Sequence, residues 1–287
     1  MAPPVRAQLY RGELGGVHWE LATRPPARPL AAYVRDLQGY IERSAANVRR
    51  REFSGTAVVV IFEFEPRLRV YEHGESTRHA RYPGGFVAGL DETYTWTEHA
   101  GYQAGIQLNL QPLAARRVFG LPLRELRGRV VCFEDLLPAQ RGLSEELAEL
   151  SSWDARFDRV ERFLTEQLSC AKPNDRAVSW ALERIAAHGG QIDLEHLARE
   201  LGYSHKHVIA RFHDQVGITP KLWARIVRFE RLRRELTTRG TPRSWAELAL
   251  ACGYYDQAHL AREVKQFTGD TPRALLRPTA FQANDDR

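Results

Sequence analysis

The sequence predicts an α+β N-terminal domain, built as a small antiparallel β-barrel or sandwich with helices, followed by an all-α C-terminal domain with two helix-turn-helix units. Three observations support this prediction. Short runs of β-branched and aromatic residues alternate with turn residues in the first half of the chain, every later segment has helical periodicity, and one short pattern occurs twice near the end. A length of 287 residues allows two separate cores.

The composition is that of an ordinary globular protein, with 43% apolar and 27% charged residues. The first residues contain no apolar leader, and no run approaches the roughly 18 apolar residues of a membrane span. We therefore expect a cytoplasmic protein that does not enter a membrane. Cys132, Cys170 and Cys252 are widely spaced, which favours reduced thiols over a disulfide framework or a metal clip.

The N-terminal part contains one strong strand signal and several weaker ones. Residues 56–64, TAVVVIFEF, are β-branched and aromatic and end at Pro66, so they predict a buried strand. Leu30 to Ser44 carries apolar residues at helical spacing and predicts a helix, and Leu113 to Phe119 predicts a short helix after Pro112. Shorter strands are predicted at 68–71, 86–88, 94–97, 105–110 and 129–133.

An apolar stripe over residues 143–168 predicts helices that connect the two halves, with a new helix capped at Ser151-Ser152. The stripe packs either on its own β-domain or in a dimer seam; Asp154 and Glu161 interrupt a strict heptad, and both alternatives remain open. The polar segment 169–175 suits a linker. The predicted divisions are a β-rich sensor or dimerisation domain at 1–140, a helical connector at 141–170, a DNA-binding domain at 176–277 and a frayed tail at 278–287.

The repeated pattern is the most informative feature of the C-terminal half. Its first copy runs from Leu197 through Gly202-Tyr203 to GITP at 217–220, and its second from Leu248 through Gly253-Tyr254 to GDTP at 269–272. The two copies are offset by 51 residues before the turn and by 52 after it. The extra residue falls in the turn, where a helical pair tolerates a change of length. Each copy predicts a helix-turn-helix.

In the first copy, Gly202 ends one helix and Ser204 caps the next. Val208 and Phe212, four residues apart, point into the core. The predicted outward residues of this helix are His205, Lys206, Ile209, Ala210 and His213.

In the second copy, Asp256 takes the capping position, and Leu260 and Val264 face the core. Arg pairs bidentately with guanine and Gln with adenine in the major groove of DNA, so Arg262 is the leading candidate for a base contact. The outward residues of this helix are Gln257, Ala258, Arg262 and Lys265.

The excess positive charge lies entirely in the repeated half. From Lys172 onward there are 19 Lys and Arg against 14 Asp and Glu, whereas residues 1–171 hold 22 of each. This distribution suits a domain that neutralises DNA phosphates. Many arginines lie in a long predicted helix between the two copies, either as a solvated face paired with glutamates or as contacts to the DNA backbone; Arg228 is assigned to the backbone.

These residues resemble the AraC/XylS family of bacterial transcription regulators over roughly residues 176–277. The resemblance rests on the spacing of the two units, on GITP and GDTP after the second helix of each, and on GYYDQAHLAREVKQFTG near the C-terminus. It implies two recognition helices, joined by a linker helix, that enter successive major-groove segments on one face of the DNA. The family often has an Arg where this chain has Ala210, so Lys206 is expected to take more of the base contact.

The segment GIQLNLQPLAARRVFGLPLREL, at 105–126, more loosely resembles the end of the sensor domains of some family members, whose usual role is to bind a small effector or to hold a dimer. The predicted function is therefore sequence-specific transcription regulation under the control of a small-molecule effector. The expected partners are double-stranded DNA, RNA polymerase, an effector and a second copy of the chain. No effector-binding residue is assigned.

The alternative is an enzymatic β-domain with an appended DNA-binding module, which a pocket with perturbed titratable groups would favour. His73, His79 and His99 lack the HxH pair of a cupin-like metal site, and no GxSxG, P-loop or Rossmann glycine pattern occurs. We therefore expect no enzyme activity, no metal and no cofactor. Tyr94 and Trp96 are assigned either to the β-domain core or to the wall of an effector cavity.

Overall fold

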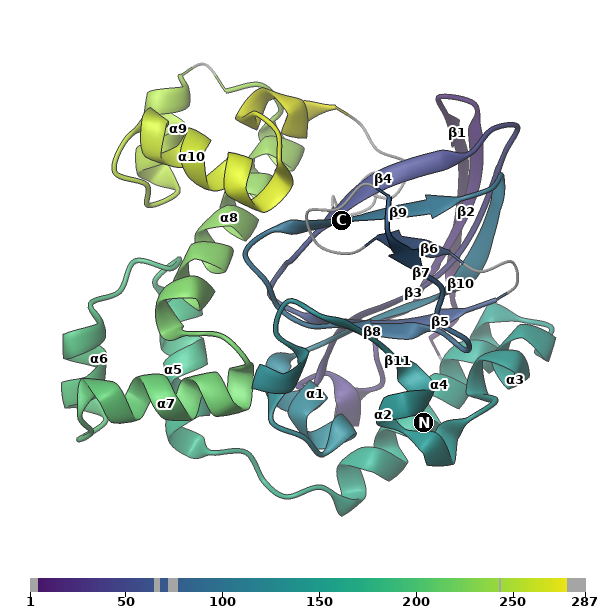
Figure 1. Ribbon diagram of the computed structural model, residues 1–287, viewed down its shortest axis with the longest axis horizontal. Helices are drawn as coiled ribbons and strands as arrows, with labels where there is room; N and C mark the ends of the chain where they lie inside the picture. Colours follow the sequence, from purple (N-terminus) through teal and green to yellow (C-terminus); the bar gives the residue numbers. More distant parts are fainter. Residues whose placement is uncertain (1–4, 65–67, 72–76, 243, 278–287) are drawn as a thin grey trace.

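The computed structural model describes residues 5–64, 68–71, 77–242 and 244–277. Within them the chain forms two antiparallel sheets on one side and a group of helices on the other (Figure 1). The larger sheet has seven strands in the order β1-β2-β3-β10-β5-β8-β11, and the smaller has four in the order β4-β9-β6-β7. The strands are β1 Gln8–Leu14, β2 Val17–Thr23, β3 Val34–Ser44, β4 Val48–Phe53, β5 Val58–Glu63, β6 Arg69–Tyr71, β7 His79–Ala80, β8 Phe86–Ala88, β9 Tyr94–His99, β10 Tyr102–Leu110 and β11 Val130–Cys132.

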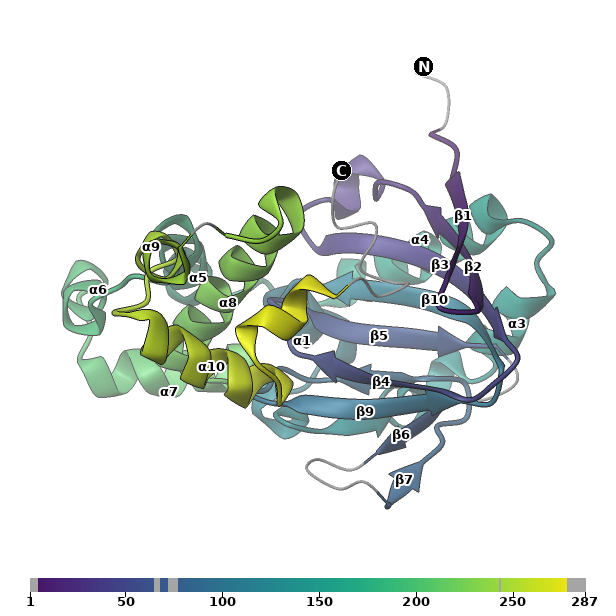
Figure 2. The ribbon, with the colours of Figure 1, turned by 90° about the horizontal axis from the view of Figure 1, so that it is seen from above.

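Helices cover the outer face of the larger sheet and make up the rest of the chain. Those of the first half are α1 Pro112–Phe119, α2 Phe133–Leu136, α3 Leu143–Glu149 and α4 Trp153–Cys170, with short 3-10 turns η1 Arg28–Leu30, η2 Leu123–Leu126 and η3 Pro138–Gln140. Those of the second half are α5 Arg176–Ala187, α6 Leu194–Glu200, α7 His205–Val216, α8 Pro220–Arg239, α9 Trp245–Ala251 and α10 Gln257–Thr268, followed by η4 Pro272–Leu276. The two sheets face each other without closing into one continuous barrel, as Figure 2 shows from above.

The predicted helix at Leu30 to Ser44 is wrong, because only η1 there is helical and residues 34–44 form strand β3. Leu37 and Ile41, four positions apart, fit the spacing of a helix, but they also lie on one face of strand β3. Gly39 is the clearest mark of the sheet: a Cβ at this position would lie 2.3 Å from the ring of Trp153. A glycine here lets α4 lie directly on the sheet.

Strands β1, β2 and β4 were missed because their sequences are mixed or charged, and the short β7 was missed as well. Strands β1 and β2 form a hairpin around Gly15-Gly16, both of which have positive φ angles of 60° and 78°. A two-residue turn of this kind favours glycine at both positions. Strand β4, VRRREF, holds three arginines in a row, which is unusual for a strand and hid its β-structure. The strands predicted from residue 56 onward are present.

The apolar stripe over 143–168 packs on its own β-domain, so the dimer-seam alternative is not supported. Leu147, Phe157, Val160 and Leu164 are fully buried in the core. Phe163 makes edge contacts with Phe62 of the sheet and with Phe133. The helix break is confirmed at Ser152, whose hydroxyl accepts a hydrogen bond from the Ala155 amide. Asp154 and Glu161, which interrupt the heptad, lie 3.7 and 2.9 Å from the guanidinium of Arg24, and Asp158 lies 2.7 Å from it.

The duplicated pattern forms two helix-turn-helix units, α6–α7 and α9–α10, joined by α8 (Figure 1). The predicted caps are confirmed: Ser204 accepts from the His207 amide, and Asp256 accepts from the His259 amide. Gly202 and Gly253 have φ angles of 68° and 85° and end the first helix of each unit. The tail at 278–287 lies outside the described residues. Among the described helices, none has the length and apolar character needed to cross a membrane.

Candidate nucleic-acid interface and the adjoining cavity

The outward residues of α7 divide into an open end and a covered end. His205, Lys206 and Ala210 are exposed, and Ile209 is half-buried. His213 is also half-buried, because the far end of α7 lies against η2 of the β-rich half, where Asp214 pairs with Arg124. Burial, together with the charges of Arg127 and Arg124, lowers the pKa of His213. Only the N-terminal part of α7 is freely available to a ligand.

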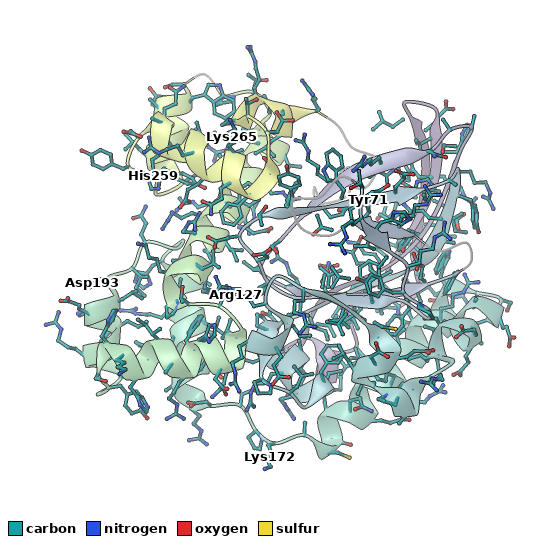
Figure 3. All side chains as sticks on the ribbon, viewed as in Figure 1. Tyr71, Arg127, Lys172, Asp193, His259 and Lys265 are labelled. Carbon is teal, nitrogen blue, oxygen red and sulfur yellow. The ribbon has the colours of Figure 1, made fainter. Side chains whose placement is uncertain are left out.

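The outward residues of α10 are all open. Gln257, Ala258, Arg262 and Lys265 are exposed, whereas Leu260 and Val264 are fully buried. Figure 3 shows Lys265 and His259 on this second unit. The helix thus presents a short basic face with amide and guanidinium donors, as DNA reading requires.

Arg225 and Arg228 of α8 are largely covered by neighbouring residues, whereas Arg234 and Arg239 are exposed. Arg228 is only 15% exposed; it donates to the Gly190 carbonyl at 2.8 Å and lies 3.5 Å from Glu263 of α10. Arg225 binds Glu263 at 2.7 Å as well. These contacts join α8 to α10 and to the turn between α5 and α6. They favour a structural role for Arg228 over the predicted contact with the DNA backbone.

The helical half is docked on the β-rich half through charged and aromatic contacts. Glu92 accepts from Arg225 at 2.8 Å and from Gln266 at 3.0 Å. Arg51 of β4 pairs with Asp270 at 3.2 Å, and the Phe53 ring meets Phe229 of α8 edge-on at 5.7 Å. Arg127 lies where the two halves meet (Figure 3). The position of each unit therefore depends on the β-rich half.

A cavity of about 840 Å³ lies between the two sheets and reaches the helical half. Alternate residues of the larger sheet face it with polar groups, while the residues between them, such as Leu37 and Ile106, are buried on the helical side. Glu230 and Arg233 of α8 and Asp270 close one end. The polar residues of β3 and β10 in its wall are Asp36, Gln38, Tyr40, Gln103, Gln107 and Asn109.

Glu42 anchors a buried polar cluster at the inner wall of the cavity. It is 0% exposed, and Arg50 binds it with two hydrogen bonds of 2.7 and 2.8 Å. Gln103 donates to it, and His99 Nε2 lies 3.3 Å away. Burial alone raises the pKa of Glu42, but the donors His99, Arg50 and Gln103 together lower it below its usual value. This cluster joins the two sheets.

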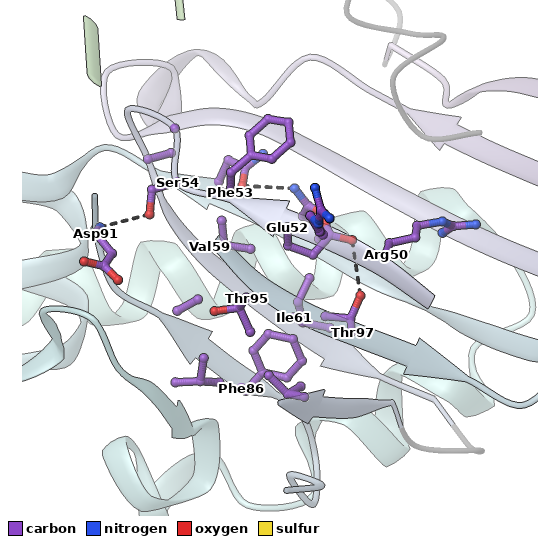
Figure 4. Close-up of a pocket in the computed structure, with 18 of the residues that line it drawn as sticks. Arg50, Glu52, Phe53, Ser54, Val59, Ile61, Phe86, Asp91, Thr95 and Thr97 are labelled. Carbon is purple, nitrogen blue, oxygen red and sulfur yellow. Dashed lines mark hydrogen bonds between the residues drawn. The ribbon is translucent and has the colours of Figure 1, made fainter. Parts of the chain in front are cut away.

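Glu52 is one of the carboxylates that line the cavity, and its side chain is exposed to the space inside it. Its side chain accepts one hydrogen bond, from the Thr97 hydroxyl at 3.3 Å, and makes no salt bridge with any described residue (Figure 4). Protein surrounds this space, and the resulting desolvation raises the pKa of Glu52, although the charges of Arg50 and Arg233 oppose the shift. Val59, Ile61 and Phe86 form an apolar part of the same wall.

Some predictions for the β-rich half fail. Tyr94 and Trp96 belong to neither the core nor the cavity wall, because Thr95 and Thr97 face the cavity and the aromatic residues face away from it. Tyr94 instead lies against Gly269 at the end of α10, where a Cβ would be 2.4 Å from its ring. His79 is exposed on β7, His99 belongs to the Glu42 cluster and His73 lies outside the described residues. Within the described ranges, no group of three metal-ligating side chains occurs.

Sequence reasoning did not identify the polar residues of the cavity. The signal was present as a period of two: Asp36, Gln38, Tyr40 and Glu42 alternate along β3, but this segment was interpreted as a helix. In β10, Gln103, Gln107 and Asn109 alternate with apolar residues in the same way. Polar residues on the inner face of a sheet indicate a cavity rather than a dry core.

Comparison with known proteins places the repeat in a family. Residues 197–278 match the family model described as a helix-turn-helix domain. No curated protein sequence matches the chain.

Several solved structures are similar to this chain or to parts of it, among them the following three. A probable AraC family transcriptional regulator from Rhodopseudomonas palustris is 29% identical over 36% of this chain and all of its own, with a TM-score of 0.33. The C-terminal domain of AraT, a response regulator from Geobacillus stearothermophilus, is 24% identical over 37% of this chain and 88% of its own, with a TM-score of 0.34. ToxT from Vibrio cholerae is 9% identical over 86% of this chain and 99% of its own, with a TM-score of 0.49.

The family match covers both helix-turn-helix units except the start of α6, and the caps, turns and open basic face of α10 supply the parts that such a domain uses. Residues 197–278 of this chain are therefore a helix-turn-helix domain with two units, built to bind DNA in a transcription regulator.

Proposed function

We propose that α7 and α10 read two successive major-groove segments of one DNA site. The single observation that carries the proposal is the open face of α10, on which Gln257, Ala258, Arg262 and Lys265 are all exposed. Arg262 would contact guanine, and Gln257 adenine. In the first unit Lys206 would take the main contact, with His205, Ile209 and Ala210 beside it. His213 would join them only if α7 moved away from η2.

Arg228 does not belong to this set as we now propose it. Its guanidinium holds the Gly190 carbonyl and lies beside Glu263, so it would fix the relative position of α8 and α10. Replacing Arg228 would therefore change DNA affinity indirectly, by altering the relative position of the two helix-turn-helix units. The backbone contacts would fall to exposed cations such as Lys265.

The test is the affinity of Arg262→Ala for a duplex that the wild-type protein selects and for a shuffled duplex of the same length. We expect a loss of about 1–3 kcal/mol on the selected duplex and a much smaller loss on the shuffled one. Arg141→Ala is the matched control, because Arg141 is exposed in the β-rich half. Equal weakening on both duplexes would refute the base contact of Arg262.

The cavity between the sheets is the effector site that we propose. The Glu52 carboxylate accepts one hydrogen bond from a described residue, Thr97, and so has acceptor capacity left for a ligand. Val59, Ile61 and Phe86 provide an apolar surface in the same cavity. These groups suit a small amphipathic molecule with a hydrogen-bond-donating, basic head. Because Glu230, Arg233 and Asp270 also line the cavity, such a ligand would affect how the helical half docks.

Two probes of similar size and opposite charge test this site. 2-Phenylethylamine should raise the melting temperature of the wild-type protein more than 3-phenylpropionate does, and Glu52→Gln should reduce that difference. A larger rise with 3-phenylpropionate, unchanged in Glu52→Gln, would assign the cavity to anions instead.

We propose ligand binding rather than catalysis for the β-rich half. The cavity holds titratable groups with shifted pKa values, but Glu42 is fully buried behind Arg50 and Gln103 and is not available to a substrate. That leaves Glu52 without a buried acid–base partner in reach of the same ligand. The chain would act in the cytoplasm as a sensor domain over 1–140, a connector over 141–170 and a DNA-binding domain over 176–277. Its further partners would be RNA polymerase and a second copy of itself.

A further inference from the structure

Strand β1 forms an open edge of the seven-stranded sheet. It pairs with β2 on one side and with no described strand on the other. Its residues are exposed or half-buried along the whole length, and Leu9 and Leu14 are 49% and 37% exposed. Long, flat edges with exposed apolar residues are the edges that pair with another chain. Both views place β1 on the side of the molecule away from α7 and α10 (Figure 1, Figure 2).

The hairpin decides which backbone groups of β1 are free. Leu14 and Val17 flank the two-residue turn, so their backbone amides and carbonyls hydrogen-bond to each other. In an antiparallel pair, such hydrogen-bonded residues recur at every second position. The amide and carbonyl groups of Gln8, Tyr10, Gly12 and Leu14 are therefore directed at β2. Those of Leu9, Arg11 and Glu13 are directed outward and are available to another strand.

We propose that two copies of this chain form a dimer by antiparallel pairing of their β1 strands, with Gly12 at the two-fold axis. A symmetric pair must place outward groups opposite outward groups, which leaves few registers. Centring the pair on Arg11 or on Glu13 places like charges directly opposite. Centring the pair on Gly12 places Arg11 of each copy opposite Glu13 of the other, so the dimer contains two such pairs of opposite charge.

The same register also covers the apolar residues of the edge. Leu14 falls opposite Tyr10 of the second copy, and Leu9 falls opposite Gly15, which has no side chain to obstruct it. The centre is compatible with close approach, because Gly12 has only the Trp19 ring over it. The result is one continuous sheet through both copies, with β-strand addition supplying the hydrogen bonds.

This dimer leaves both recognition helices at the outer ends of the assembly. It does not depend on the DNA contacts assigned to α7 and α10, because β1 lies on the opposite side of the molecule. A monomeric protein would therefore not argue against the DNA contacts, and the loss of the DNA contacts would not argue against the β1 dimer.

The test is sedimentation velocity of the full chain across the micromolar range, with charge-reversed variants. The wild-type protein should dimerise. Arg11→Glu or Glu13→Arg alone should weaken the dimer by about tenfold, because two attractive pairs become repulsive. The double variant R11E/E13R restores opposite charges and should recover most of the affinity.

The double variant also controls for folding. Arg11 pairs with Glu20 and Glu13 with His18 within one chain, at 2.7 and 3.4 Å. Each single variant loses one of these pairs, and the double variant loses both. Recovery would therefore come from the contact between copies. Arg141→Glu, a reversal elsewhere on the exposed surface, should have no effect. The proposal would be overturned if the wild-type protein stayed monomeric at every concentration tested. It would also be overturned if neither single charge reversal changed the dimer affinity.

Discussion

Glu42 is a fully buried, charged carboxylate. Arg50 and Gln103 compensate for the lost hydration, so the carboxylate joins β3 to the neighbouring sheet. Replacement by Ala would leave the Arg50 charge partly buried without its partner. We expect Glu42→Ala to lower the free energy of unfolding by about 3–5 kcal/mol, measured by urea denaturation.

The matched control is an ion pair at the surface. Arg159 binds Glu146 at 2.6 Å, and the Glu146 side chain is largely exposed. Glu146→Ala should cost about 1 kcal/mol or less. Similar losses for the two variants would show that the Glu42 cluster is not the main bond between the sheets.

Glu42 and Glu52 should have opposite effects on stability as pH changes. The pKa of Glu42 is lowered by folding, so its contribution is present above the ordinary carboxyl value and is lost as pH falls through the lower folded value. The pKa of Glu52 is raised, so its contribution is present at low pH and is lost as pH rises through the folded value.

Glu52→Gln tests this sign. The variant should melt at a higher temperature than the wild-type protein at neutral pH, and the difference should vanish in acid, where both side chains are neutral. Thermal melts of both proteins between acid and neutral pH measure it. A variant that melts lower at neutral pH would mean that the Glu52 charge is stabilised by its surroundings, and the proposed acceptor site would lose its basis.

At the level of elements, local signals predicted the caps and failed at the sheets. Ser204 and Asp256 each accept a hydrogen bond from the amide three residues later, so their role follows from the sequence alone. Strand β3 depends on partners far along the chain, since Ile106 of β10 lies opposite Gly39. Leu37 and Ile41, four positions apart, lie on one face of a strand as well as of a helix, so their spacing did not distinguish the two structures.

The cap of α10 supplies a prediction at this scale. Asp256→Ala leaves the His259 amide without its acceptor and should cost about 1 kcal/mol in the free energy of unfolding. Because the cap begins the recognition helix, DNA affinity should fall as well. Asp256→Asn keeps the acceptor and should restore most of both. A stability loss of the same size in Asp256→Asn would show that the charge, rather than the cap, matters.

At the level of the whole molecule, the β-rich half holds both helix-turn-helix units in place. The bonds that do this join distant residues: Arg225 and Gln266 bind Glu92, which lies more than 130 positions earlier. A single sequence gives no sign of such pairs, so the two domains were predictable from composition and periodicity while their docking was not. The cavity between the sheets was missed for another reason, since the alternating polar residues of β3 were interpreted as part of a helix.

Glu92→Ala should loosen this docking without unfolding either half. Hydrogen exchange should become faster at the end of α10 and around residues 90–93 and stay unchanged in α6, which does not touch Glu92. Glu145→Ala, an exposed carboxylate on α3, is the control. Unchanged exchange at α10 in Glu92→Ala would assign the docking to the aromatic contact of Phe53 with Phe229 instead.

The central claim is that two units read two adjacent DNA segments, and a selection of bound DNA fragments with the purified protein tests it most directly. The wild-type protein should enrich a two-part motif with its halves about 10 base pairs apart. Lys206→Ala should lose base preference in one half, and Arg262→Ala in the other. A single undivided motif, or the same half lost in both variants, would contradict the account.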